Sequence, residues 1–164
     1  MGDNIIFNNR KIYKGEPIAD IVVKSSILLK PINCPEQLNS SAIDEFLLIF
    51  LVAAKSKGIS YFKNLSELNQ KESPRLKLGS KILNMIGIKT KLTDHSIKIY
   101  GQPNLKLKKN YEVKNYLKDH RIFMMTAIMA LTLGGNWKIH DSDSIKTSFP
   151  SFLKIVKSLG GKIK

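Results

Sequence analysis

The sequence contains one cysteine, Cys34, among 164 residues, so an internal disulfide bond is excluded. This usage fits a reducing compartment such as the cytoplasm. The longest apolar runs, Phe46–Ala54 and Ile122–Leu133, are shorter than the roughly 20 residues that a membrane-spanning helix needs. The first residues also lack the basic and apolar regions of a secretory signal peptide. We therefore expect a cytoplasmic protein with no membrane partner.

Arginine is scarce in spite of a net charge of +14, because only three of the 27 basic residues are arginine. Proteins that bind nucleic acids usually use arginine for bidentate contacts and interleave basic residues with aromatic ones. We interpret most of the lysines as a solvated surface and do not expect nucleic acid as a partner. A basic nucleic-acid-binding domain is kept as an alternative, because a basic surface attracts anions of every kind.

Two parts of the sequence repeat each other in order. Lys81–Lys91 resembles Lys154–Lys164, which lies 73 positions later. Asp44 and Asp119, 75 positions apart, each precede an apolar run that ends at a glycine. Two such coincidences predict an internal repeat of about 75 residues. Met1–Ile5 resembles the Met85–Gly87 and Leu159–Gly160 junctions, where the second helix of a repeat ends and a strand begins. We therefore expect the chain to begin inside a unit and to be part of something longer, or to carry an atypical cap.

Each repeat is predicted to run helix, strand, helix, strand. The first helix is apolar on nearly every side and should be buried, whereas the second is amphipathic. Gly87 and Gly160 should end the second helices in a left-handed conformation. The predicted helices are about Asp44–Lys57, Pro74–Ile86, His120–Leu133 and Ser148–Leu159. The predicted strands are Ile18–Val23, Ile59–Phe62, Lys89–Leu92, Ser96–Tyr100 and Trp137–His140, with turns or loops at Gly101–Asn104 and around Lys108–Asn110.

Four segments carry a resemblance to a known family. They are Ser-Ala-Ile-Asp-Glu-Phe (41–46), Glu-Leu-Asn-Gln-Lys-Glu-Ser-Pro-Arg (67–75), Asp-His-Arg-Ile-Phe-Met (119–124) and Thr-Ser-Phe-Pro (147–150). In this order and spacing they are similar to the Ile-Asp-Glu, Lys-Glu-Ser-Asp-Arg, Asp-His-Arg-Ile-Ala-Met and Ser-Phe-Pro motifs of the 5-enolpyruvylshikimate-3-phosphate (EPSP) synthases. The resemblance covers essentially the whole chain.

This resemblance implies an α/β fold of repeated β-α-β-α-β-β units with buried helices and outer sheets. Family members have two domains of three units each. Residues 1–164 would then be part of the C-terminal domain, about two units and the tail of a third. The N-terminal domain has no counterpart here, and a separate chain could supply it. We expect the isolated chain to be inactive and to expose an apolar edge near Met1–Phe7.

The family's reaction transfers the enolpyruvyl group of phosphoenolpyruvate to the 5-hydroxyl of shikimate 3-phosphate, in the biosynthesis of aromatic amino acids. It implies no metal and no organic cofactor. By resemblance, Asp44 lies near the reacting hydroxyl, and Lys71 and Glu72 form the catalytic pair. Arg75 and Arg121, with Lys71, His120 and Asp44 around them, would converge on one pocket that binds substrate anions.

Residue patterns alone leave simpler roles open for these side chains. Asp44 and Asp119 each precede an apolar helix and could act as N-caps. Lys71 and Glu72 could belong to a solvated loop, and Glu45 is expected to be structural. The arginines are unusual at helix N-termini, where a cation is unfavourable and a bound anion is favourable.

The sequence also departs from the family motifs at several positions. Pro74 replaces an aspartate, and Ser73 is then predicted to cap the following helix with proline in its first turn. Thr147 stands where some members carry lysine, so no role passes to Lys146. Alternatives within and beyond the class are a UDP-N-acetylglucosamine enolpyruvyl transferase and a non-catalytic remnant that kept the fold alone.

Overall fold

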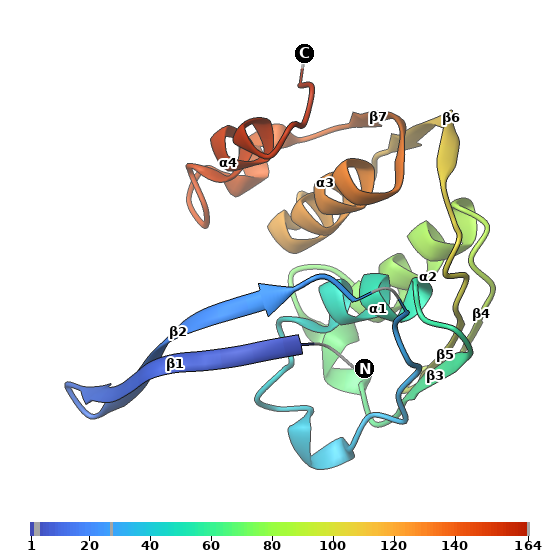
Figure 1. Ribbon diagram of the computed structural model, residues 1–164. Helices are drawn as coiled ribbons and strands as arrows, with labels where there is room; N and C mark the ends of the chain where they lie inside the picture. Colours follow the sequence, from blue (N-terminus) through green and yellow to red (C-terminus); the bar gives the residue numbers. More distant parts are fainter. Residues whose placement is uncertain (2–3, 27, 164) are drawn as a thin grey trace.

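The computed structural model describes residues 1, 4–26 and 28–163. It opens with a long antiparallel hairpin of β1 (Asn4–Tyr13) and β2 (Glu16–Lys24), which extends away from the rest of the molecule (Figure 1). Its outward apolar side chains are solvent-exposed, including Phe7 (47%) and Ile21 (62%). The predicted exposed apolar edge is therefore present.

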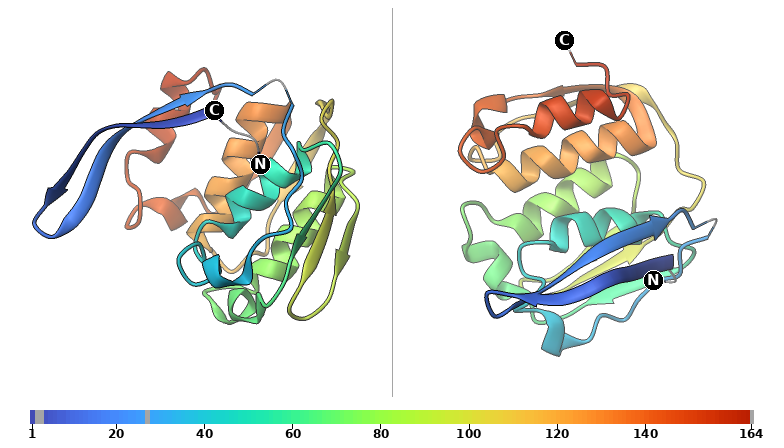
Figure 2. Two further views of the ribbon diagram at one scale, coloured as in Figure 1. Left: turned by 60° about the horizontal axis from the view of Figure 1, so that its bottom comes forward. Right: turned by 60° about the vertical axis from the view of Figure 1, so that its left-hand side comes forward.

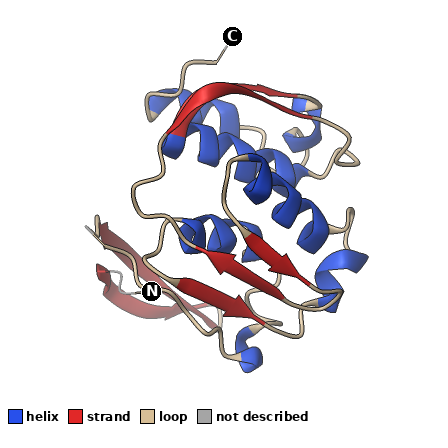
Figure 3. Ribbon diagram, turned by 90° about the vertical axis from the view of Figure 1, so that its right-hand side faces the viewer, coloured by secondary structure: helices blue, strands red, loops and turns tan. Residues whose placement is uncertain are grey.

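A first complete unit follows the hairpin. Its elements are α1 (Phe46–Ala54), β3 (Ile59–Phe62), α2 (Arg75–Met85), β4 (Thr90–Leu92) and β5 (Ile97–Tyr100). The strands form an antiparallel sheet in the order β3-β5-β4. This sheet lies on the outside of the molecule with the helices behind it (Figure 3).

A second unit repeats this plan over the rest of the chain. Its elements are β6 (Leu107–Val113), α3 (His120–Leu133), β7 (Gly134–Ile139) and α4 (Phe152–Ser158). Here β6 and β7 pair in parallel. Parallel bridges from Leu29 to Ser56 and from Asn33 to Tyr61 place the segment before α1 in the equivalent position beside β3. The repeat is thus confirmed. Short 3-10 helices lie at Glu36–Leu38, Ser66–Gln70 and Ser142–Ile145.

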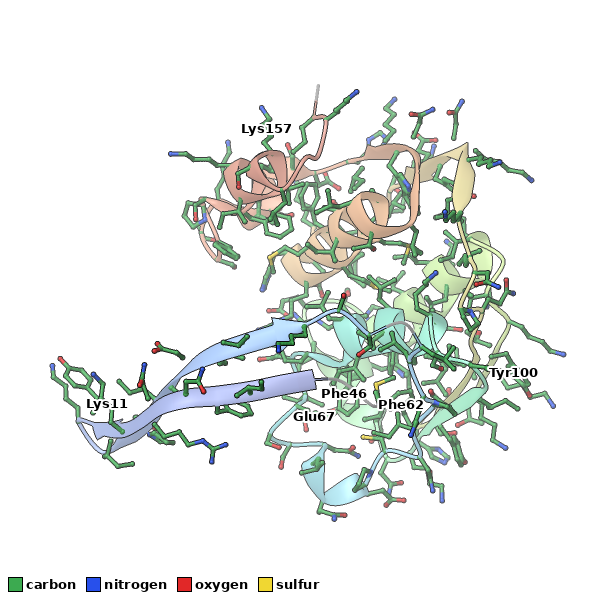
Figure 4. The ribbon with its side chains drawn as sticks, viewed as in Figure 1. Lys11, Phe46, Phe62, Glu67, Tyr100 and Lys157 are labelled. Atoms are coloured by element: carbon green, nitrogen blue, oxygen red, sulfur yellow. The ribbon has the colours of Figure 1, made fainter. Side chains whose placement is uncertain are left out.

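The core forms where α1, α2 and α3 contact one another (Figure 2). Phe46, Phe50 and Phe62 are fully buried and pack with ring centroids 5.1–6.0 Å apart. Phe46 and Phe62 lie inside the body, whereas Lys11 lies near the tip of the hairpin (Figure 4). A Cβ added at Gly79 would come within 2.9 Å of Leu47, so glycine permits the close packing of α2 on α1.

The predicted helix ends and burial are largely confirmed. Gly87 and Gly160 follow α2 and α4 with φ angles of 88° and 96°. The helix α1 is buried on most sides, while α3 leaves Thr132 exposed. No helix among the described residues is both long and apolar enough to cross a bilayer.

The prediction of a loop around Lys108–Asn110 was wrong, because these residues lie within β6. All three residues are polar and exposed, so this half of the strand lacks the alternation that Tyr111–Val113 shows. A register shift between Leu107 and Asn110 also interrupts the pairing with β7. Residues 108–110 are extended because β6 pairs with β7, and their own sequence pattern does not indicate a strand.

Candidate functional site

Asp44, just before α1, joins two arginines that come from different units. Its Oδ1 accepts from Arg75 Nη1 at 3.1 Å, and its Oδ2 lies 3.3 Å from Arg121 Nη2. Arg75 begins α2 and Arg121 lies in the first turn of α3. The structure therefore brings the three predicted site residues together, although 77 positions separate Asp44 from Arg121.

Arg75 is the buried centre of this cluster, with a side chain only 2% exposed. Its Nε donates to Asp119 Oδ2 at 2.9 Å, and Nη2 binds the carboxylate of Glu72. Burial by itself would lower the pKa of Arg75, but the hydrogen bond and charge of Asp119, with Glu72 and Asp44, raise this pKa above its usual value. The guanidinium therefore stays charged and fixed in position.

Asp119 both caps α3 and binds α2, and its Oδ1 also accepts from Arg75 Nη2 at 3.4 Å. Oδ1 accepts from the backbone N–H of Arg121 at 2.9 Å and of Ile122 at 3.4 Å, which confirms the predicted N-cap of α3. Oδ2 accepts from Ser73 Oγ at 2.8 Å and from Arg75. Burial would raise the pKa of Asp119, but hydrogen bonds from Arg75 and Ser73 and the charge of Arg75 lower it. Asp119 thus links α2 to α3.

Two predicted caps are wrong because the side chains bind other groups. The N-cap of α1 is Glu45 rather than Asp44, whose carboxylate is taken up by the two arginines. The N-cap of α2 is Pro74, which offers no side-chain acceptor, while Ser73 turns to Asp119. Asp44 binds arginine and Ser73 binds a carboxylate, and both interactions are charge-assisted and therefore stronger than a cap on a neutral backbone N–H.

Arg121 is the more accessible of the two arginines, with 26% of its side chain exposed. Its Nη1 donates to the carbonyl oxygen of Asp44 at 2.8 Å and to Glu45 Oε1 at 3.2 Å. Sequence reasoning assigned Glu45 a structural role and missed this ion pair. The pairing depends on the approach of α1 and α3, which no local pattern reveals.

The remaining predicted site residues surround this centre less closely. Glu72 binds Arg75 directly. Lys71 instead forms an ion pair with Glu67 at 2.8 Å, four residues earlier. His120 begins α3 and is half-buried, and its side chain makes no hydrogen bond or ion pair with a described residue. Lys146 follows the last 3-10 helix and is exposed. Among the described residues, Lys71 and His120 therefore make no hydrogen bond or ion pair with the side chains of the arginine cluster.

Basic and aromatic side chains also meet on the outer face of the three-stranded sheet. Lys63 Nζ and Lys98 Nζ lie 5.1 and 4.8 Å from the centre of the Tyr61 ring, and Lys89 Nζ lies 5.2 Å from the Tyr100 ring. The expectation that basic and aromatic residues do not interleave was therefore wrong: Lys63 is two residues from Tyr61, and strand pairing places Lys98 opposite Tyr61. Among the described residues, the cation–π pairs on this face of the sheet involve lysine and no arginine, and such pairs of exposed lysines are weak.

Comparison with known proteins shows that the chain has part of the enolpyruvyl transferase fold. The structure is similar to the enolpyruvyl transferase NikO from Streptomyces tendae, with a TM-score of 0.65 over 99% of this chain and 34% of that one. At 12% identity this likeness shows the fold alone. The structure of EPSP synthase from Acinetobacter baumannii is more similar, with a TM-score of 0.90 and 34% identity over 98% of this chain and 37% of that one.

The family model described as EPSP synthase (3-phosphoshikimate 1-carboxyvinyltransferase) matches residues 7–156. The 3-phosphoshikimate 1-carboxyvinyltransferases of Ruthia magnifica and Hydrogenovibrio crunogenus are 36% and 34% identical over 99% and 98% of this chain. The chain therefore belongs to the EPSP synthase family. It spans about 37% of the length of the Ruthia relative and 35% of the Hydrogenovibrio one.

Proposed function

We propose that this chain forms one wall of the active site for enolpyruvyl transfer from phosphoenolpyruvate to the 5-hydroxyl of shikimate 3-phosphate. The observation that carries the proposal is the meeting of Arg75 and Arg121 on Asp44. Membership of the EPSP synthase family supports the choice of substrates. A guanidinium suits both the carboxylate and the phosphate of phosphoenolpyruvate, because it offers parallel N–H donors to two oxygens.

The proposed roles follow from accessibility and charge. Arg121 is partly exposed and receives the anion of phosphoenolpyruvate. Arg75 is buried and holds Asp44, Glu72 and Asp119 in place, and its contact with substrate requires Glu72 or Asp44 to move. His120, beside Arg121 at the start of α3, adds a further donor to the bound anion.

The reaction needs proton transfer in both directions, and it balances without an oxidant or reductant. The 5-hydroxyl oxygen forms a bond to the enol carbon, its proton leaves, and the methylene carbon gains a proton. The tetrahedral intermediate then loses phosphate and a methyl proton. Asp44 faces the hydroxyl, and Lys71 and Glu72 carry protons to and from the methylene. For this role, Lys71 must first break its surface ion pair with Glu67.

We further propose that residues 1–164 are part of the C-terminal domain, and that the other wall of the site comes from the N-terminal domain. Holding two substrates together can supply roughly 7–11 kcal/mol of a reaction barrier. One wall cannot provide this, so the chain alone should have little or no turnover.

The test measures phosphate release from phosphoenolpyruvate and shikimate 3-phosphate. The purified chain should be inactive, and mixing it with the complementary N-terminal portion of a relative should restore turnover. Turnover by the chain alone at the rate of a full-length relative would refute the one-wall arrangement. A folded, assembled mixture that stays inactive would count against the proposed reaction.

A further inference from the structure

Glu45 holds the accessible arginine of the proposed anion site. Its carboxylate lies 3.2 Å from Arg121 Nη1, and its own side chain is 59% exposed. Arg121 is 26% exposed, against 2% for Arg75. An incoming anion therefore meets Arg121 first, and it finds Glu45 already on that guanidinium.

The charges of the cluster show why an anion must replace a carboxylate. Two guanidiniums face four carboxylates, which belong to Asp44, Glu45, Glu72 and Asp119. An added anion would meet a surplus of negative charge, so binding requires one carboxylate to leave.

Glu45 is the carboxylate that can leave without disturbing the buried centre. Asp44, Glu72 and Asp119 all pair with Arg75, whereas Arg121 is the one ion-pair partner of Glu45 among the described residues. The backbone of Glu45 is held separately, because its N–H donates to the carbonyl of Ala42 at 2.9 Å. The side chain can therefore turn into water while α1 keeps its position.

We propose that Glu45 is an internal competitor for Arg121 and sets the affinity of the site for anions. This inference rests on the proposed function, because it takes Arg121 as the ligand for the substrate anion. It makes Glu45 a specificity-determining residue. Ligands whose carboxylate or phosphate can engage the guanidinium with two oxygens displace Glu45, and weaker anions such as chloride do not.

The test is a titration of the folded 164-residue chain with phosphoenolpyruvate at low salt, followed by calorimetry or by NMR shifts of the α3 amides. Glu45→Gln removes the competing charge and keeps the side-chain size. We expect its dissociation constant to fall by about 1.5- to 5-fold, the range that the loss of an exposed ion pair permits. Asp143→Asn is the matched control, because Asp143 is 52% exposed and pairs with Lys118 at 3.5 Å. It removes the same charge and should leave the constant unchanged.

Arg121→Ala separates this inference from the proposed function. If Arg121→Ala binds as tightly as the unmodified chain, or if no form binds, both the anion site and the role of Glu45 are overturned. If Arg121→Ala loses binding while Glu45→Gln is unchanged or weaker, the inference about Glu45 is overturned and the anion site stands. Equal tightening by Glu45→Gln and Asp143→Asn would also overturn it, because the effect would then come from net charge.

Discussion

Replacement of Asp119 should be among the most destabilising changes at the site. The side chain is fully buried, and it serves both Arg75 and the N-terminus of α3. Removing one partner of a buried ion pair typically costs about 3–5 kcal/mol, and losing an N-cap costs about 1 kcal/mol. Arg75 keeps Asp44 and Glu72, so the two costs do not simply add. We expect Asp119→Ala to lower the free energy of unfolding by about 3–5 kcal/mol.

The assay is urea denaturation followed by circular dichroism at fixed protein concentration. Asp119→Asn keeps an acceptor for the α3 cap, so it should lose less stability than the alanine variant. Asp143→Ala is the control, because its pair with Lys118 is exposed and should contribute less than about 1 kcal/mol. A loss below about 1 kcal/mol for Asp119→Ala would refute the view that this carboxylate holds α2 and α3 together.

Three further outcomes are expected. The pKa of Asp119 is lowered in the folded chain, so ionised Asp119 stabilises the fold above pH 3.8, its ordinary pKa. This contribution to the free energy of unfolding is lost as the pH falls below that value. Asp119→Asn should therefore show a smaller loss of stability on acidification than the unmodified chain. Burial, with the charge of Asp141, raises the pKa of Tyr116 to about 12, so its absorbance change should come last in an alkaline titration and be missing in Tyr116→Phe. The exposed apolar hairpin should make the chain self-associate, so Phe7→Asp and Ile21→Asp should reduce association in sedimentation experiments; a chain that stays monomeric, or variants with an unchanged profile, would contradict this expectation.

Much of the fold could be predicted because local patterns and tertiary packing agree. The run Phe46–Ala54 is apolar on all sides, which suits a helix enclosed by two others. Gly87 and Gly160 occupy left-handed positions that favour glycine. Strand β6 escaped prediction because its exposed Lys108, Lys109 and Asn110 show no alternation.

The candidate site was less accessible to sequence reasoning. The motifs identified Asp44, Arg75 and Arg121, but each pattern was compatible with a local role such as a cap. Arg75 and Asp119 lie 44 positions apart, so their pairing is not visible in a local pattern. The Asp119 carboxylate also caps α3, and the sequence shows only this local role. The surplus of carboxylates around the arginines depends on how the two units pack, so no single motif could show it.

We propose that Arg121 and Arg75 both serve enolpyruvyl transfer. The most direct measurement replaces the matching part of the Acinetobacter baumannii EPSP synthase with this chain and compares turnover of the chimera with its Arg121→Ala and Arg75→Ala variants. Removing one charge-assisted hydrogen bond to the substrate should cost about 1.5–3 kcal/mol, or about 10- to 150-fold in turnover. Our account predicts an active chimera and reductions of at least this size in both variants, with Asp143→Asn unaffected. An active chimera whose arginine variants fold and keep full turnover would contradict it.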